Sequence, residues 1–344
     1  MIMKYLVFIL FLIVAFCTVP AINGWAFRQY LGFAFISILI SIMLTKKFHI
    51  SVGLCFFITT LYGLFRSGIP QFGSEVVSSI MVLLLFSCIS LGFSESLLNL
   101  ILPALALVAI GDAIIMLVRF LMHFEYMDVY WVLTNASLDA SFIALMFPIV
   151  WILGQKKSVQ IPLSIFIVLA VVAAKSNTAL LVLVITGISL FWEALVLVPL
   201  SYFALGHKFA HSEGRIDNWK IMMGFWQDHV NHLFGSGPGT YWILAQSIQA
   251  HKAGDQVWGW MHNDFLQVLF EQGLIGLGSV LFLYFMMLWK SFKKPILLSM
   301  VIGYGVIAMT LYPIHLFFFQ LIGLALIALC FNREGHYDRT PILQ

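Results

Sequence analysis

The sequence predicts an all-α membrane protein, a polytopic transmembrane helical bundle of about twelve spans with one large outward-facing loop. Hydrophobic residues make up 62% of the 344 residues and charged residues only 10%, whereas soluble domains carry about 25% charged residues. The mean hydropathy of +1.00 agrees with this imbalance. A chain so poor in charge cannot cover itself with a polar surface, so we expect its apolar segments to lie in a bilayer.

Apolar runs of membrane-spanning length recur along the chain and define the expected helices in order. These runs lie near residues 3–22, 29–45, 50–65, 76–93, 97–122, 139–154, 159–174, 177–191, 194–206, 274–290, 296–312 and 314–331. Several are short, and tilted or half-inserted helices would change the number of spans by about two. The first run resembles a signal peptide, but the following "TVPAING" lacks a small-x-small cleavage site, which favours an uncleaved helix.

The distribution of Lys and Arg predicts the orientation, because cytoplasmic connections carry an excess of these residues. One side collects Lys4, Lys46, Lys47, Lys156, Lys157, Lys290, Lys293, Lys294, Arg333 and Arg339. The short connections of the other side carry only Arg28, Arg66, Arg119 and Lys175. Both termini are therefore predicted to be cytoplasmic. The expected organisation is an N-terminal bundle over residues 1–206, an outer loop over 207–273, and C-terminal helices with a short cytoplasmic tail over 274–344.

The 207–273 loop is long and hydrophilic, and such loops in compact proteins are usually functional. It holds six of the ten histidines and five of the ten tryptophans. An amphipathic helix at the membrane surface is expected from near Gly214, with Ser212 as a candidate cap. Its apolar residues recur at steps of three or four: Ile216, Trp219, Met222, Met223, Trp226, Val230 and Leu233. The polar residues expected on its other faces are Arg215, Asn218, Lys220 and Asp228.

The stretch "FGSGPGTYW" at 234–242 is expected to end this helix as a turn, because its glycines and proline cannot continue it. Its likeness to a phosphate-binding loop lacks the preceding strand and the nucleotide motif. A polar stretch over about 246–259 then leads to His262.

His262 stands at the head of a largely apolar helix. In that helix, Asn263, Gln267 and Glu271 recur every four residues and form a polar lane, which should face the protein interior. The glycines expected to allow close helix packing below it are Gly273, Gly276 and Gly278.

Three stretches carry a resemblance to a known family: "RIDNW" (215–219), "FGSGPGTY" (234–241) and "HNDFLQVLFEQGLIG" (262–276). They resemble the carboxy-terminal signature of the O-antigen ligase and polymerase superfamily. The pattern of the ligases is His, then Asn, Ser or Gln, nine residues, Gly, two residues and Gly. The residues that match it without a gap are His262, Asn263, Gly273 and Gly276.

The resemblance implies a membrane glycosyltransferase of the bacterial inner membrane. Such an enzyme moves a glycan from an undecaprenyl-diphosphate donor to a lipid A core or similar acceptor on the periplasmic face. The transfer is inverting and metal-independent, with no cofactor. The implied partners are the lipid-linked glycan, the acceptor and membrane lipid, and no nucleic acid.

The resemblance also implies roles for particular residues. The essential histidine of the family corresponds to His262 and its loop arginine to Arg215. A second family arginine corresponds to "KSNTAL" at 175–180, where Asn177 stands in its place. Lys175 is a candidate replacement, although a lysine lacks the bidentate fork that suits phosphate oxygens.

General chemistry supports the same residues. A lipid diphosphate donor needs cations where charge develops on the leaving group, which suits Arg215, with Lys175 and Arg119 at outer helix ends as helpers. An acceptor hydroxyl needs a base, and an imidazole such as that of His262 suits this work at neutral pH. The residues expected to contact the acceptor or sugar are Asn263, Trp219, Trp258 and Trp260.

Structural roles are the alternative for each residue. His262 could be a hydrogen-bonded structural histidine, Arg215 a headgroup anchor, and the loop tryptophans an interfacial belt. Two histidine pairs have spacings seen in zinc sites, His207 with His211 and His229 with His232, but no metalloprotease glutamate accompanies them. No metal site is expected.

Three functions remain open at this level: a ligase, a polymerase of the same superfamily, and a transporter or flippase for a lipid-linked glycan. A transporter should show paired halves or interrupted helices with charges near mid-membrane. Here the polar residues gather in one asymmetric loop, which favours an enzyme. Polymerases often carry two sizeable outer loops, so the single loop favours a ligase.

The orientation leads to a direct test. In a Ser247→Cys variant, the new thiol should react with a membrane-impermeant maleimide applied from outside, because the loop is predicted to face outward. Labelling only after the membrane is permeabilised would place this loop in the cytoplasm.

Overall fold

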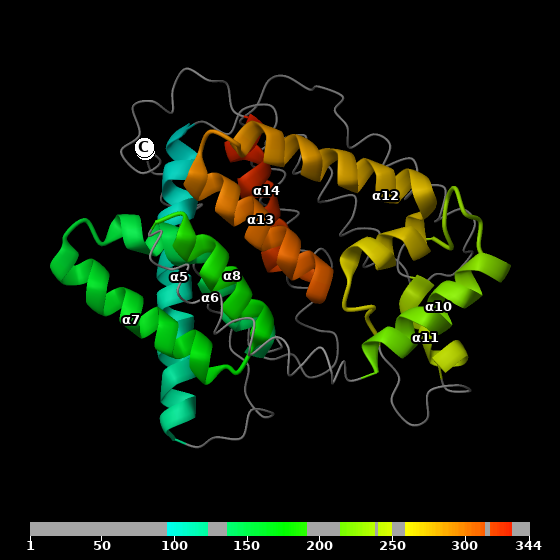
Figure 1. Ribbon diagram of the computed structural model, residues 1–344, viewed down its shortest axis with the longest axis horizontal. Coiled ribbons are helices and arrows are strands. Elements are labelled where there is room, and N and C mark those ends of the chain that lie inside the picture. Colours follow the sequence, from blue (N-terminus) through cyan, green and yellow to red (C-terminus); the bar gives the residue numbers. More distant parts are fainter. Residues whose placement is uncertain are drawn as a thin grey trace.

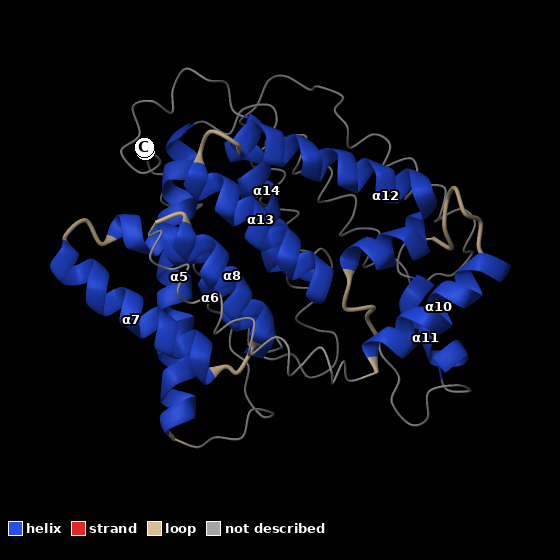
Figure 2. Ribbon diagram, in the orientation of Figure 1, coloured by secondary structure: helices blue, strands red, loops and turns tan. Residues whose placement is uncertain are grey.

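The computed structural model describes residues 95–122, 136–190, 214–237, 240–249, 259–313 and 317–331. Over these residues the fold is all-helical and contains no β-strand (Figure 2). The helices are α5 (Glu95–Leu121), α6 (Ala136–Leu153), α7 (Lys157–Ala173), α8 (Asn177–Ile188), α10 (Arg215–His229), α11 (Thr240–Gln249), α12 (Asp264–Ser291), α13 (Pro295–Thr310) and α14 (Phe317–Phe331). The all-α prediction is confirmed for this part of the chain.

Three described stretches are long and apolar enough to cross a membrane: Leu102–Leu121, Ala136–Leu153 and Asp264–Ser291. Shorter apolar helices cover Lys157–Ala173, Asn177–Ile188 and Pro295–Thr310. Each span predicted over 97–191 and over 274–331 coincides with one of these helices or with α14. The spans predicted before residue 94 and at 194–206 lie outside the described residues, so the total number of spans stays a prediction.

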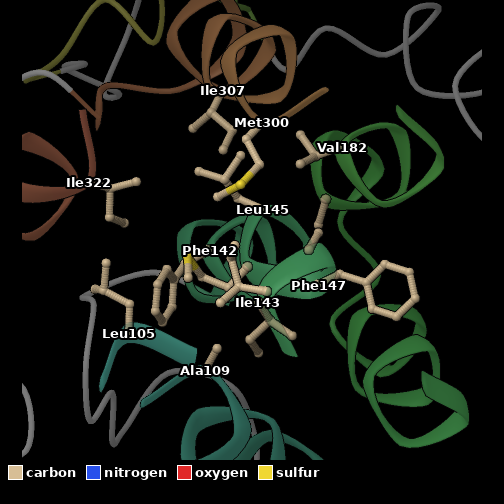
Figure 3. Packing of buried hydrophobic residues seen from close by; sticks show 14 of the residues in the cluster. Leu105, Ala109, Phe142, Ile143, Leu145, Phe147, Val182, Met300, Ile307 and Ile322 are labelled. Carbon is tan, nitrogen blue, oxygen red and sulfur yellow. The ribbon is translucent and has the colours of Figure 1, made fainter. Parts of the chain in front are cut away.

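Helix α6 is the packing centre of the bundle. Its residues from Leu138 to Val150 are buried without interruption, as expected for a helix that is apolar on all sides. Side chains from four other helices converge on it (Figure 3): Leu105 and Ala109 from α5, Val182 from α8, Met300 and Ile307 from α13, and Ile322 from α14. Helix α7 adds Ile167, Ala170 and Val171, and we call the whole cluster the bundle core.

Helix α12 is broken in its first third. Gly273 has φ 66° and ψ −165°, a conformation that is essentially restricted to glycine. In a continuous helix, the Leu274 N–H would bond to the Phe270 carbonyl and the Ile275 N–H to the Glu271 carbonyl. The break separates both pairs and leaves two donors and two acceptors for other partners.

A turn from the preceding loop supplies those partners, and we call residues 231–237 the clip. The Leu274 N–H donates to the carbonyl of His232 (2.8 Å), and the Ile275 N–H donates to that of Leu233 (3.2 Å). In the other direction, Ser236 N–H donates to the Phe270 carbonyl (3.0 Å) and Gly237 N–H to the Glu271 carbonyl (2.7 Å). The clip therefore replaces the two missing helical hydrogen bonds with four.

Two glycines make this close approach possible. A Cβ on Gly273 would overlap backbone atoms of Leu233 and Gly235, and a Cβ on Gly235 would overlap those of Glu271 and Gln272. Both glycines have positive φ, 66° and 73°. Gly273 thus packs closely against the clip, whereas the sequence predicted close packing against another helix.

The other two glycines predicted to pack closely behave differently. A Cβ on Gly276 would meet the Gln272 side chain of the same helix, and no atom of the described residues lies within 4 Å of one on Gly278. Among the described helices, the prediction of close helix packing is therefore wrong for Gly278.

The clip generates a matched stability test. Gly273→Ala and Gly235→Ala should each destabilise the protein by at least about 1–3 kcal/mol, because alanine is strained at these backbone angles and its Cβ has no space. Gly278→Ala is the control, and alanine there should be neutral or favourable by up to about 1 kcal/mol. Apparent melting temperatures of the purified variants in detergent measure the difference. Equal melting temperatures for all three would contradict the role assigned to the clip.

Candidate functional site

The loop helices form a small hydrophobic cluster of their own. Figure 1 shows α10 and α11 beside the first part of α12, away from α5 and α7. The buried members of this cluster, which we call the loop core, are Met222, Trp226, Tyr241, Ala245, Met261 and Phe270. Met261, the residue before His262, is thus anchored among the loop helices and not in the bundle core.

Helix α10 differs from its predicted form. Gly214, with φ 78°, is its N-cap residue, and Ser212 lies outside the described residues. The helix ends at His229, so Val230 and Leu233 fall beyond it, and Leu233 is 53% exposed. Asn218 is only 3% exposed, so the prediction that it occupies a face away from the apolar side is wrong.

Asn218 is buried because it belongs to a polar network between α10 and α11. Its Nδ2 donates to the Tyr241 hydroxyl (3.0 Å), and Gln249 Nε2 donates to Asn218 Oδ1 (2.6 Å) and to the same hydroxyl (3.2 Å). Burial, which is the larger effect, and the charge of Glu271 outweigh these hydrogen bonds and raise the pKa of Tyr241 to about 12. The hydroxyl therefore stays protonated.

Helix α11 itself was not predicted from the sequence. The stretch 234–242 was interpreted as a turn and 246–259 as a polar stretch, whereas the chain is helical from Thr240 to Gln249. A signal was present, because Tyr241, Leu244, Ala245 and Ile248 follow the i, i+3, i+4, i+7 pattern of a helix face.

The polar lane of α12 faces inward, as predicted. Gln267 is 1% and Glu271 2% exposed. Glu271 accepts from the Gln267 amide (3.2 Å) and from the Tyr241 N–H (3.3 Å). Asn263 is the N-cap of α12, and its side chain accepts from the Leu266 N–H (3.1 Å). Asn and Ser are favoured at this position of a helix because their side chains can accept such a bond.

The lane and α10 together fix the backbone of Met261. Gln267 Oε1 accepts from the Met261 N–H (3.1 Å), and Trp219 Nε1 donates to the Met261 carbonyl (2.6 Å). The Met261 side chain is fully buried. Trp219, expected to contact sugar or acceptor, uses its ring nitrogen for this contact.

His262 follows this clamp in an uncommon conformation. Its φ is 52°, in the left-handed region that histidine visits more readily than most residues. Its ring meets the Tyr312 ring edge to face, with centroids 5.0 Å apart, and Trp260 stacks in parallel on the same tyrosine at 5.5 Å. His262 thus lies where the loop core meets the bundle core.

Arg215 reaches the same place from the start of α10. Its NH1 donates to the backbone carbonyl of Thr310 (3.2 Å), the last residue of α13. A cation is favourable there because the last carbonyls of a helix carry partial negative charge. A guanidinium has five N–H donors, so this bond orients the group and leaves it suited to binding an anion as well.

The first turn of α8 joins the same site through Thr310. The Thr178 hydroxyl donates to the Thr310 hydroxyl (3.0 Å). Asn177 is the first residue of α8, and Lys175 precedes it, exposed and with φ 52°. Arg215 and Thr178 therefore both bond to Thr310, and the predicted donor residues Asn177 and Lys175 shortly precede Thr178 in the sequence.

Two predicted site residues are placed elsewhere or not described. Arg119 lies in the last turn of α5, and Figure 1 shows that end of α5 well separated from α10. Trp258 lies outside the described residues. Among the described residues, no group of three or more His, Cys, Asp or Glu side chains could hold a metal ion.

Electrostatics keep the imidazole neutral. Burial, and then the positive charge of Arg215, lower the pKa of His262 from 6.5 to about 4. The partial positive charge at the start of α12 acts in the same direction. A neutral imidazole is the form that can accept a proton, so the site holds a proton acceptor beside a cation at physiological pH.

The comparison with known families covers the segment that holds most of this site. Residues 129–281 match the family described as O-antigen ligase, and the matched segment contains both Arg215 and His262. This segment is therefore similar to the O-antigen ligase superfamily, whose members are ligase- or polymerase-like membrane glycosyltransferases. None of the curated proteins compared matches the chain.

Three residues of the site were not predicted from the sequence: Thr178, Thr310 and Tyr312. Thr178 lies within "KSNTAL" but was not singled out there, and Thr310 and Tyr312 lie at and just after the end of α13, beyond the matched segment. Only the folded arrangement brings them to Arg215 and His262.

The lowered pKa generates a titration test. In protein labelled with [13Cε1]histidine, the signal of His262, assigned by its loss in His262→Gln, should titrate near pH 4. In Arg215→Gln the pKa of His262 should rise toward 6.5 but stay below it, because burial still opposes the charged form. A wild-type pKa near 6.5, or the same pKa in both proteins, would contradict the electrostatic coupling.

Proposed function

We propose that this protein transfers a glycan from an undecaprenyl-diphosphate donor to a lipid A core or similar acceptor on the periplasmic face of the bacterial inner membrane. The observation that carries the proposal is the convergence of Arg215 and His262 at the end of α13. The match to the O-antigen ligase family over the segment that holds both residues supports it. Ligation is the activity that we favour over polymerisation.

His262 is the proposed general base. The imidazole takes the proton of the acceptor hydroxyl as the hydroxyl oxygen attacks the anomeric carbon from the face opposite the diphosphate. The new glycosidic bond forms as the bond from that carbon to the phosphate oxygen breaks, and undecaprenyl diphosphate leaves with the electron pair. The anomeric centre is inverted, and the imidazolium then releases its proton to water.

Arg215 is the proposed clamp for the diphosphate. Its guanidinium is oriented by Thr310 and offers the planar donor geometry that phosphate oxygens accept. As the leaving group departs, negative charge grows on its phosphate oxygens, and a fixed cation there lowers the barrier. The first turn of α8, which begins at Asn177 and follows Lys175, would add helix N–H groups to the same binding region.

Donor binding would also strengthen the base. The Arg215 charge lowers the pKa of the His262 imidazole, and a bound diphosphate would offset that charge. The pKa of the imidazole would then rise when the donor is bound. His262 would therefore be a stronger base at the step in which it accepts the proton of the acceptor hydroxyl.

Variants of the two residues test the proposal. His262→Gln should lower the transfer rate by roughly 10²- to 10⁴-fold, the usual contribution of a general base. Arg215→Gln should lower it by roughly 10²- to 10³-fold, as for loss of a transition-state donor. Transfer is measured as lipid A-linked polysaccharide in a deletion strain complemented with each variant at matched expression.

Two controls separate catalysis from structure. Arg215→Lys keeps a long cationic side chain that can donate to the Thr310 carbonyl, so a purely structural Arg215 would tolerate this change, whereas a bidentate phosphate clamp would not. Lys220→Gln removes an exposed cation from the same helix and should leave transfer unchanged. Wild-type polysaccharide levels in His262→Gln and Arg215→Gln would rule the mechanism out.

The deletion strain distinguishes a ligase from a polymerase. A missing ligase leaves long glycan chains on undecaprenyl diphosphate, whereas a missing polymerase leaves single repeat units on that carrier. Glycolipid analysis by mass spectrometry reads the two outcomes directly. Accumulated long chains are expected here.

A further inference from the structure

The segment Trp260–His262 is held between the two hydrophobic cores of the described fold. Met261 is a fully buried member of the loop core, and Tyr312, 8% exposed, is a member of the bundle core. The two neighbours of Met261 in sequence, Trp260 and His262, both contact Tyr312. Tyr312 therefore packs against the side of this segment that faces the bundle core.

The two ring contacts of Tyr312 differ in direction. The Trp260 ring is nearly parallel to it, with an interplanar angle of 10°, and the His262 ring is nearly perpendicular, at 86°. Parallel and edge-to-face arrangements are both favourable for such rings. Because the two rings come from positions two apart in one segment, Tyr312 restricts both the segment and the rotation of the imidazole.

The end of α13, next to Tyr312, also contacts Arg215. Tyr312 follows Thr310 by two residues, and the Thr310 carbonyl accepts from Arg215 NH1 (3.2 Å). The Thr178 hydroxyl ties Thr310 to α8 (3.0 Å). The end of α13 and the residues just after it thus contact both groups to which the reaction is assigned.

We propose that Tyr312 is a positioning residue, whose ring holds the His262 imidazole in register with Arg215 for glycan transfer. The proposal rests on the proposed function of His262 and Arg215, and it adds a residue from outside the segment that matches the family. A base works only within hydrogen-bond reach of its proton, and a displacement of about 1 Å can cost roughly 100-fold in rate. The ring provides the contact, and the phenolic hydroxyl is not required for it.

Tyr312→Phe and Tyr312→Leu separate the ring from the hydroxyl. In steady-state assays with purified protein, the Phe variant should keep kcat close to that of the wild type. The Leu variant should lose roughly 10- to 100-fold in kcat while the donor KM changes by less than about twofold, because Arg215 keeps its contact with Thr310. Phe292→Leu, at a ring that is 76% exposed, is the matched control and should leave kcat unchanged.

Other kinetic outcomes would overturn the proposal. Full kcat in Tyr312→Leu would show that the ring contact does not serve transfer. Equal losses in the Phe and Leu variants would assign the effect to the hydroxyl. A rise in donor KM that accounts for the whole loss would assign Tyr312 to donor binding.

A measurement on the wild-type protein keeps the test independent of turnover and of variant folding. With labelled His and Tyr rings, a nuclear Overhauser effect between the ring protons of His262 and Tyr312 is expected. Its absence would overturn the proposal whatever the kinetics show. If the effect is present while His262→Gln retains full transfer, then the contact stands and the proposed function fails.

Discussion

The hydrogen-bonded joint between the clip and the broken helix α12 is the constraint on which the rest of the site depends. Buried backbone groups without partners cost about 1–3 kcal/mol each, and the break at Gly273 creates four of them. The clip satisfies all four. Because the clip lies between α10 and α11 in sequence, this joint also brings both loop helices onto the first part of α12.

The joint also determines where His262 lies. Once α10 and α11 lie on α12, Trp219 and Gln267 can hold Met261 from two sides. His262 then emerges at the boundary of the loop core, where Tyr312 and the end of α13 belong to the bundle core. The proposed base is thus supplied by a loop and oriented by the membrane bundle, which suits a reaction between a lipid-borne sugar and a second glycan.

Local patterns allowed much of the fold to be predicted. Long apolar runs predicted the helices because span length and hydrophobicity are properties of consecutive residues. The inward lane of Gln267 and Glu271 was predictable for the same reason, since a four-residue spacing places side chains on one helix face. Two of the errors have a common cause. Asn218 is polar but buried, and Gly278 is small but open, and only their neighbours in space decide either fact.

The sequence by itself determined that the chain is a membrane protein of helices, that Gln267 and Glu271 share an inward face of α12, and which histidine and arginine match the family resemblance. These features follow from composition, period and spacing along the chain. Tertiary structure alone decided that Gly273 joins α12 to the clip, that Arg215 caps α13, and that Tyr312 meets His262. These contacts join residues many positions apart, and no local rule ranks one such pairing above another until the chain has folded.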